Sequence, residues 1–125
     1  MRCLIVDDSA AFRDAASTML ERAGIAVVGM ACNTAEALDR YRDLLPDVTL
    51  VDIDLGPESG FDVAEELHHA GIPAPPVILI STHDEQDLAD MIASSSALGF
   101  LPKFALSPDA IRDLVSGSRG TRSRP

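Results

Sequence analysis

The sequence VTLVDIDLGPESG, residues 48–60, joins an apolar run to two aspartates and a turn. Residues 48–51 are apolar apart from Thr49, which is typical of a strand buried on both faces of a parallel sheet. The run ends at Asp52, Asp54 follows two residues later, and the Gly- and Pro-containing stretch 56–60 then interrupts the chain. This segment therefore predicts a buried strand that carries carboxylates at its C-terminal end.

Outward from this segment, short apolar runs alternate with longer segments of helical periodicity. The other predicted strands are Cys3–Val6, Ile25–Ala31, Val77–Ile80 and Gly99–Leu101. The predicted helices are Ser9–Ala23, Asn33–Leu45, Phe61–Ala70, Asp84 through Ile92, and Ser107–Val115. Asn33 and Ser107 are the predicted N-caps, and Glu36 is expected to complete a capping box with a reciprocal bond to Asn33. Five strands and five helices in strict alternation predict a doubly wound α/β sheet with right-handed crossovers.

The length and composition indicate a single globular domain. The chain has 125 residues, of which 46% are hydrophobic and 24% charged. We expect the domain to span residues 1–116 and residues 117–125, which contain three arginines and no acid, to form a flexible basic tail or a truncated linker. Residues 1–116 carry 7 basic against 20 acidic side chains, so this part is a poor candidate for direct nucleic-acid binding.

The chain is expected to be cytoplasmic. Cys3 and Cys32 form neither a disulfide framework nor a metal-binding spacing, and the predicted strands place them at opposite ends of the sheet. The N-terminus has too few apolar residues for a signal peptide, and no segment approaches the ~20 apolar residues of a membrane span. We therefore expect free thiols, a reducing compartment and no membrane partner.

Polar residues gather where the predicted strands end. The residues at these ends are Asp7, Asp8, Asp52, Asp54, Ser81 and Lys103. In a doubly wound sheet the C-terminal ends of the strands form one rim, so we expect these side chains to meet at a solvated edge. Crowded carboxylates raise each other's pKa unless a cation neutralises them, and accessible oxygen ligands suit Mg2+. The ammonium and the hydroxyl then supply what is needed to hold a phosphoryl group.

In this order, and each at a strand end, these residues resemble the receiver domains of two-component response regulators. The resemblance extends from Cys3 to about Val115. It rests on the motifs Asp7-Asp8, Val51-Asp52-Ile53-Asp54 with the Gly60 turn, Ile80-Ser81, and Gly99-Phe100-Leu101-Pro102-Lys103. It implies a flavodoxin-like five-stranded parallel sheet of order 2-1-3-4-5 with five helices.

The resemblance also implies the chemistry. Asp52 would be the phosphoacceptor for a partner histidine kinase. Mg2+ would be the cofactor, bound by the carboxylates of Asp8 and Asp52, by the backbone carbonyl of Asp54, and by Asp7 through water. Ser81 and Lys103 would contact the phosphoryl oxygens. Ser81 and Phe100 would form a switch that alters the surface of the fourth helix, fifth strand and fifth helix, where an output domain or a second copy could bind.

Two departures from the family pattern stand close to this site. Many receivers have a proline after the lysine, whereas here Phe104 follows Lys103 and the proline precedes it, so no cis-proline is expected after the lysine. Asp54 is acidic where other members often carry a neutral or longer side chain, and His83 lies two residues after Ser81. Both residues are placed to alter access of a hydrolytic water.

Parts of this residue pattern also occur in proteins with other functions. The Asp52-Ile53-Asp54 motif resembles the nucleophile motif of haloacid-dehalogenase-type phosphatases, but in those enzymes an acid pair follows the lysine, and here it precedes it. A nucleotide-binding role lacks a glycine-rich first turn. A receiver-like module that signals without phosphorylation remains open. Considered without the other site residues, Asp7 and Asp8 could also act only as caps of the first helix. Enzymatic activity is expected only as self-catalysed phosphorylation and dephosphorylation.

Overall fold

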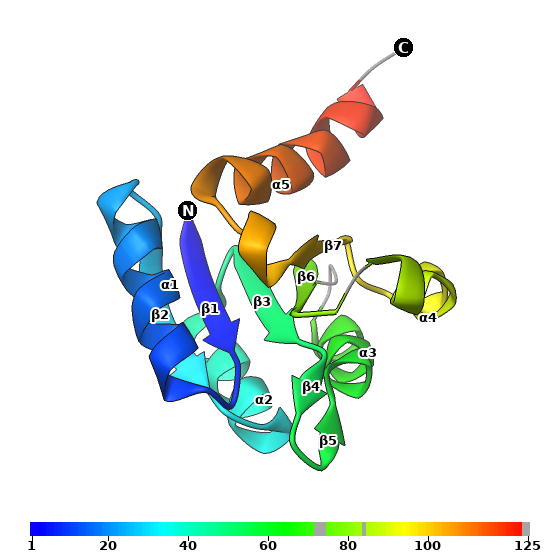
Figure 1. Ribbon diagram of the computed structural model, residues 1–125. Helices are drawn as coiled ribbons and strands as arrows, with labels where there is room; N and C mark the ends of the chain where they lie inside the picture. The colour runs from blue at the N-terminus through cyan, green and yellow to red at the C-terminus, as the bar shows by residue number, and fades with distance from the viewer. Residues whose placement is uncertain (72–74, 84, 124–125) are drawn as a thin grey trace.

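A five-stranded parallel sheet forms the centre of the molecule, with helices on both of its faces (Figure 1). This computed structural model describes residues 1–71, 75–83 and 85–123. The strands of the sheet are β1 (Arg2–Val6), β2 (Ala26–Ala31), β3 (Val48–Asp52), β6 (Val77–Ser81) and β7 (Gly99–Pro102). Their spatial order is β2-β1-β3-β6-β7, which confirms the predicted order 2-1-3-4-5.

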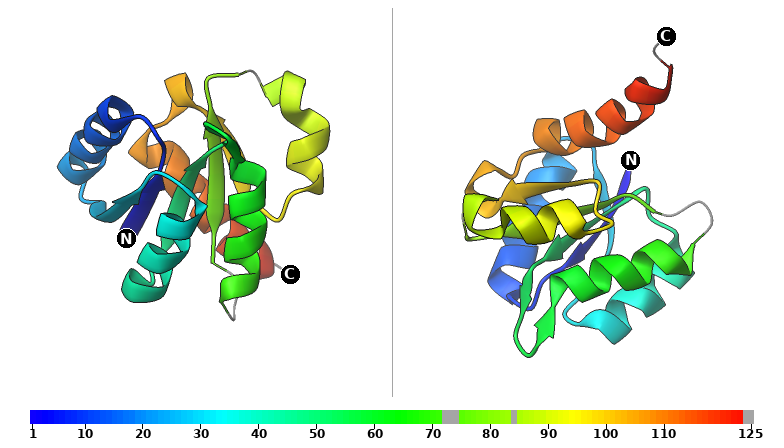
Figure 2. Two further views of the ribbon diagram at one scale, coloured as in Figure 1. Left: turned by 90° about the horizontal axis from the view of Figure 1, so that it is seen from below. Right: turned by 90° about the vertical axis from the view of Figure 1, so that its right-hand side faces the viewer.

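Five α-helices cover the sheet in two layers (Figure 2). They are α1 (Ala10–Arg22), α2 (Thr34–Leu44), α3 (Gly60–Ala70), α4 (Ala89–Ser94) and α5 (Pro108–Ser123). Alternate residues of each strand face opposite layers. Cys3 and Ile5 of β1 contact the core under α1 and α5, whereas Leu4 and Val6 contact the core under α2 and α3. The fold is therefore the predicted doubly wound α/β sheet.

Side-chain caps define where several of the helices begin. The hydroxyl of Ser9 accepts a hydrogen bond from the backbone N–H of Phe12, and the side chain of Asn33 accepts one from Glu36. The carboxylate of Glu36 accepts from the N–H of Cys32, one residue before the cap, so the predicted reciprocal bond to Asn33 itself is not made. The predicted cap at Asn33 is confirmed, and so is the one at Ser107, whose hydroxyl accepts the N–H of Ala110.

The fourth and fifth helices differ from the prediction. The fourth begins with a 3-10 turn, Glu85–Leu88, and α4 ends at Ser94, where Ser94 and Ser95 donate hydrogen bonds to carbonyls of the preceding turn. Its predicted start, Asp84, lies outside the described residues. The fifth helix continues to Ser123, so the predicted end near Val115 was wrong. The residues after Val115 are poor helix formers, but extending a helix that has already started costs much less than nucleating one.

A small hairpin, absent from the prediction, follows the central strand. Its two-residue strands are β4 (Asp54–Leu55) and β5 (Glu58–Ser59), which pair antiparallel around a turn with Gly56 at φ 66°. Strands this short give no periodicity for a sequence to display. A 3-10 turn, Lys103–Ala105, likewise follows β7. Among the described residues, no helix has the length and apolar character needed to cross a membrane.

Candidate functional site

Three aspartates from two neighbouring strand ends form an acidic cluster. Strands β1 and β3 are parallel neighbours with Val6 opposite Val51, so the residues that follow, Asp7 and Asp52, lie side by side. One carboxylate oxygen from each of Asp7, Asp8 and Asp52 lies within 4.8 Å of the others. The predicted convergence of these three carboxylates is therefore present in the fold.

The burial of this cluster differs from the predicted solvated rim. Asp8 is exposed, but Asp7 is fully buried and Asp52 is only 5% exposed. Asp52 is the last residue of β3 and is still paired with Ile80 of β6, so its side chain starts inside the sheet edge. The expectation of a solvated rim was wrong for Asp7 and Asp52. Strand pairing continues to Asp52, one residue beyond the apolar run, and the N–H of Asp7 donates to the carbonyl of Ala31 at the end of β2.

Lys103 places its charge between the two buried acids. Its Nζ atom lies 2.8 Å from Oδ2 of Asp7 and 3.2 Å from Oδ2 of Asp52. Burial alone would lower the pKa of Lys103, but hydrogen bonds and charge from Asp7 and Asp52 outweigh it and raise the pKa. The ammonium also lies 4.2 Å from the ring centroid of Phe12, a cation–π contact.

Opposing effects act on the carboxyl group of Asp52. Burial raises its pKa, and the charge of Asp7 adds to that effect. The backbone N–H of Asp54 donates to Oδ1 over 3.0 Å, and the ammonium of Lys103 donates to Oδ2; both lower the pKa without cancelling the rise. Each oxygen of Asp52 thus has a defined partner, and the carboxylate is held in one orientation.

Asp7 is fixed in place from its own loop. Its Oδ1 atom accepts the N–H of Ser9 over 2.8 Å, and its backbone carbonyl accepts a hydrogen bond from the guanidinium of Arg13. Ser9, and not either aspartate, caps α1. The helix-cap alternative for Asp7-Asp8 is therefore wrong, which leaves the position of Asp7 to be explained by the cluster.

The remaining predicted site residues come from β6 and β7. Ser81, at the end of β6, is fully buried, and its Oγ atom accepts the N–H of His83 over 3.0 Å. Phe100 of β7 is 8% exposed and packs in the core under α2 and α3. The structure thus holds Phe100 inward and places Ser81 at the C-terminal end of β6, on the same rim.

Asp54 lies beside the acidic cluster and not in it. Its carboxylate points to His83, with 3.2 Å between Oδ2 and Nε2, and both side chains are more than half exposed. The predicted metal contact of Asp54 involves its backbone carbonyl, so this side-chain contact leaves that prediction open. His83 is therefore exposed and at the same time close to an acid.

A clasp, defined as Glu58 with Thr34, ties the hairpin to α2. The N–H and the hydroxyl of Thr34 both donate to Oε1 of Glu58, and these bonds lower the pKa of the Glu58 carboxyl. Across the turn, a Cβ atom on Gly56 would lie 3.7 Å from Oδ2 of Asp8, so the hairpin borders the cluster. Sequence reasoning missed this clasp because its partners are 24 residues apart.

Comparison with known protein families assigns this chain to one of them. The family model for the response regulator receiver domain matches residues 3–116. The chain belongs to the response regulator receiver family. This confirms the resemblance found in the sequence, and it does not favour the phosphatase alternative.

Individual relatives agree with this receiver assignment. The chemotaxis protein CheY of Thermotoga maritima is 31% identical over 102 residues, which cover 82% of this chain and 84% of that protein. A protein-glutamate methylesterase/protein-glutamine glutaminase of Halobacterium salinarum is 32% identical over 91% of this chain. The signal receiver domain of NarL from Mycobacterium tuberculosis superimposes with a TM-score of 0.82 at 32% identity, covering 93% of this chain and 96% of that one.

The relatives differ in how much more chain they contain. The receiver described here spans 32% of the length of the methylesterase and 56% of the length of the full NarL protein, but 84% of CheY. Relatives of this receiver thus include proteins of nearly its own size as well as larger ones with further segments.

Proposed function

We propose that this receiver domain takes a phosphoryl group from a cytoplasmic histidine kinase onto Asp52. The observation that carries the proposal is the position of the Asp52 carboxylate. It belongs to the acidic cluster, it is hydrogen-bonded to Lys103, and it is oriented by the N–H of Asp54. Asp7 is more deeply buried than Asp52, and Asp8 lacks the contact with Lys103. Of the three carboxylates, that of Asp52 is therefore the one that is both oriented by Lys103 and more accessible to a phosphodonor than Asp7.

The donors at the site fit Mg2+. Asp7, Asp8 and Asp52 offer hard carboxylate oxygens, and Oδ2 of Asp7 is buried and, among the described residues, has only the ammonium of Lys103 beside it. We assign Asp8 and Asp52 as direct ligands, the Asp54 carbonyl as a third, and Asp7 as a ligand through water. When bound, Mg2+ would offset negative charge on the carboxylates and on the phosphoryl oxygens.

The residues then have separate roles in transfer. An oxygen of Asp52 attacks the phosphorus of a phosphohistidine; a P–O bond forms, the P–N bond breaks, and the imidazole keeps the electron pair and takes a proton. The ammonium of Lys103, already 3.2 Å from Asp52, follows the added charge onto a phosphoryl oxygen. The hydroxyl of Ser81, whose oxygen accepts the N–H of His83, would donate its own hydrogen to a phosphoryl oxygen.

The output follows from Ser81 and Phe100 on neighbouring strands. In the register of β6 and β7, Leu79 pairs with Phe100 and Ser81 with Pro102. Movement of the hydroxyl toward the phosphoryl group would change the packing around Phe100 and the nearby surface of α4, β7 and α5. No described residue of α4 is fully buried, so this helix can shift at low cost. We propose this surface for an output domain or a second copy.

The domain limits are part of the same proposal. We place the receiver in residues 1–116 and treat residues 117–125 as a basic tail or the start of a linker.

The direct test is the mass of the intact protein after incubation with acetyl phosphate. We expect one phosphoryl group on the wild type in the presence of Mg2+, and none after chelation. Asp52→Asn should abolish the addition, whereas Asp54→Asn, which changes the neighbouring exposed acid, should keep it. Addition that survives Asp52→Asn would overturn the assignment. If no addition occurs and beryllofluoride also fails to bind, a receiver that signals by binding alone becomes the better account.

A further inference from the structure

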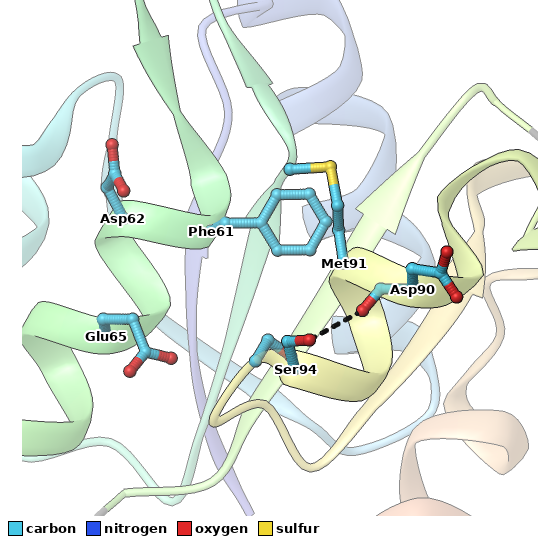
Figure 3. A pocket seen from close by; sticks show the side chains of 7 residues that line it. Phe61, Asp62, Glu65, Asp90, Met91 and Ser94 are labelled. Atoms are coloured by element: carbon cyan, nitrogen blue, oxygen red, sulfur yellow. Dashed lines mark hydrogen bonds between the residues drawn. The ribbon is translucent and has the colours of Figure 1, made fainter.

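A groove lies between α3 and α4, and none of the residues that line it belongs to the acidic cluster. Its volume is about 340 Å3. Figure 3 shows Phe61 of α3 and Met91 of α4 pointing toward one another across it, with acidic residues on both helices around them. The apolar part is formed by Phe61 and Met91, and the acidic part by Asp62, Glu65 and Asp90.

The apolar part of the groove is open to solvent. Phe61 is packed into the core and is 9% exposed, but Met91 is 53% exposed although it is large and apolar. The hydroxyl of Ser94, which also lines the groove, donates to the carbonyl of Asp90. Apolar surface of this kind, bordered by charges, is typical of a contact site.

The acidic part has a negative charge that no lining residue balances. Asp62 and Asp90 are exposed, and none of the lining residues is basic. Glu65 accepts hydrogen bonds from the N–H and the hydroxyl of Ser96, and these lower its pKa, so it is ionised at neutral pH. A groove with apolar walls and carboxylates at its edge suits arginine, whose long stem packs on apolar surface while its guanidinium binds carboxylate.

The chain has one segment of this chemistry. Residues 118–125 contain three arginines and no acid, whereas residues 1–116 are strongly acidic. This segment begins within the last turns of α5, a helix that packs on the face of the sheet shared with α1, while the groove belongs to the opposite face. The end of α5 extends beyond the sheet, away from α3 and α4 (Figure 1). The geometry therefore favours the groove of another molecule over the chain's own.

We propose that the basic C-terminal segment of one copy binds in the α3–α4 groove of a second copy. Its arginines would pair with Asp62 and Asp90 and lay their stems against Phe61 and Met91. The contact uses none of the residues assigned to phosphoryl transfer. A test of this contact is therefore independent of the proposed function.

Sedimentation equilibrium of the full chain, unphosphorylated and at low salt, tests the proposal through two charge reversals. One reverses the groove (Asp62→Arg with Asp90→Arg), and the other reverses the segment (Arg119→Glu with Arg122→Glu). The wild type should self-associate, and each reversed variant alone should associate about tenfold more weakly or worse, a change of about 1.4 kcal/mol. An equimolar mixture of the two variants should recover association, because opposite charges meet again.

Two further variants separate this contact from general charge effects. Asp39→Arg with Asp43→Arg makes the same charge change at exposed positions of α2, and it should leave association unchanged. Met91→Gln removes apolar surface without changing charge, and it should weaken association. A wild type that stays monomeric, a mixture that fails to recover association, or a control that behaves like the groove variant would each overturn the proposal. The proposal would also be overturned if the basic segment bound the groove of its own chain, which would be seen as protection of the groove residues in a monomer.

Discussion

The ammonium of Lys103 lies 3.2 Å from the carboxylate of Asp52, so the one lysine of the chain is bound to the proposed phosphoacceptor before any phosphoryl group arrives. The same ammonium lies 2.8 Å from Asp7. Lys103 therefore occupies the position of a counter-ion for two buried acids. A metal ion at the cluster would share these carboxylates with it.

Removal of this counter-ion should destabilise the protein without weakening metal binding. Lys103→Ala leaves Asp7 and Asp52 buried without a cation, and we expect a loss of about 3 kcal/mol in the free energy of unfolding without Mg2+. Since lysine no longer competes for the carboxylates, the Mg2+ dissociation constant should stay equal or fall. Urea unfolding and calorimetric titration measure the two effects. Arg42→Ala, at an exposed site, is the control. A large loss of Mg2+ affinity in Lys103→Ala would show that the roles are divided differently.

Replacement of the phosphoacceptor should stabilise the fold. The pKa of Asp52 is raised by burial and by Asp7, so the folded state favours its protonated form. Its ionisation therefore costs stability once the pH rises through the folded-state pKa. Asp52→Asn should raise the free energy of unfolding at pH 7 by roughly 1 kcal/mol, with the gain disappearing in acid.

Urea denaturation of wild type and Asp52→Asn at neutral and acidic pH checks this. Asp8→Asn removes a charge from the exposed member of the cluster and should gain less. An Asp52→Asn protein less stable than wild type at pH 7 would show that the Lys103 contact outweighs the cost of burying the charge.

Gly60 is required by the backbone of the phosphoacceptor. A Cβ atom at this first residue of α3 would lie 2.1 Å from the carbonyl oxygen of Asp52. Gly60→Ala should therefore cost at least about 3 kcal/mol of stability, because the obstacle is backbone and not a flexible side chain. Gly117→Ala provides the contrast: a Cβ in α5 meets nothing within 4 Å, and alanine should stabilise that helix by roughly 0.5–1 kcal/mol. Equal effects in thermal unfolding would contradict the close approach.

The clasp between Glu58 and Thr34 should make stability depend on pH. The two bonds from Thr34 lower the pKa of Glu58, so their stabilising effect is present above the ordinary glutamate pKa and is lost as the pH falls through the lowered value. Wild type should therefore be more stable than Glu58→Ala at pH 7, with the difference shrinking in acid.

Amide hydrogen exchange of the hairpin provides a second reading of the same change. Loss of the clasp should speed exchange in Asp54–Leu55, next to the cluster, and leave β1 unchanged. Glu66→Ala, on the exposed side of α3, should do neither. A pH-independent difference between wild type and Glu58→Ala would mean that the carboxylate contributes only through packing.

The sequence predicted the sheet because its information is local and repeated. Apolar runs such as Val48–Val51 and Val77–Ile80 define the strands, and the rule that parallel strands end at one rim then brings Asp7 and Asp52 together. The order of the motifs along the chain predicted the family, and the family model that matches residues 3–116 confirms this prediction.

The features that were missed depend on contacts between distant residues. The burial of Asp52 depends on its pairing with Ile80, and the clasp joins residues 24 positions apart. The contact of His83 with Asp54 depends on two loops meeting. The last helix extends beyond its predicted end. Helix propensity describes each residue separately, whereas a helix that has already formed extends cooperatively.

The measurement that tests the central claim most directly is the location of the acyl phosphate. Borohydride reduction of the phosphorylated protein, followed by proteolysis and mass spectrometry of the peptides, marks the modified aspartate as homoserine. We predict homoserine at position 52 and nowhere else, with formation dependent on Mg2+. Homoserine at Asp7, Asp8 or Asp54 would contradict the account, because the contacts of Lys103 and of the Asp54 N–H would then have been assigned to the wrong carboxylate.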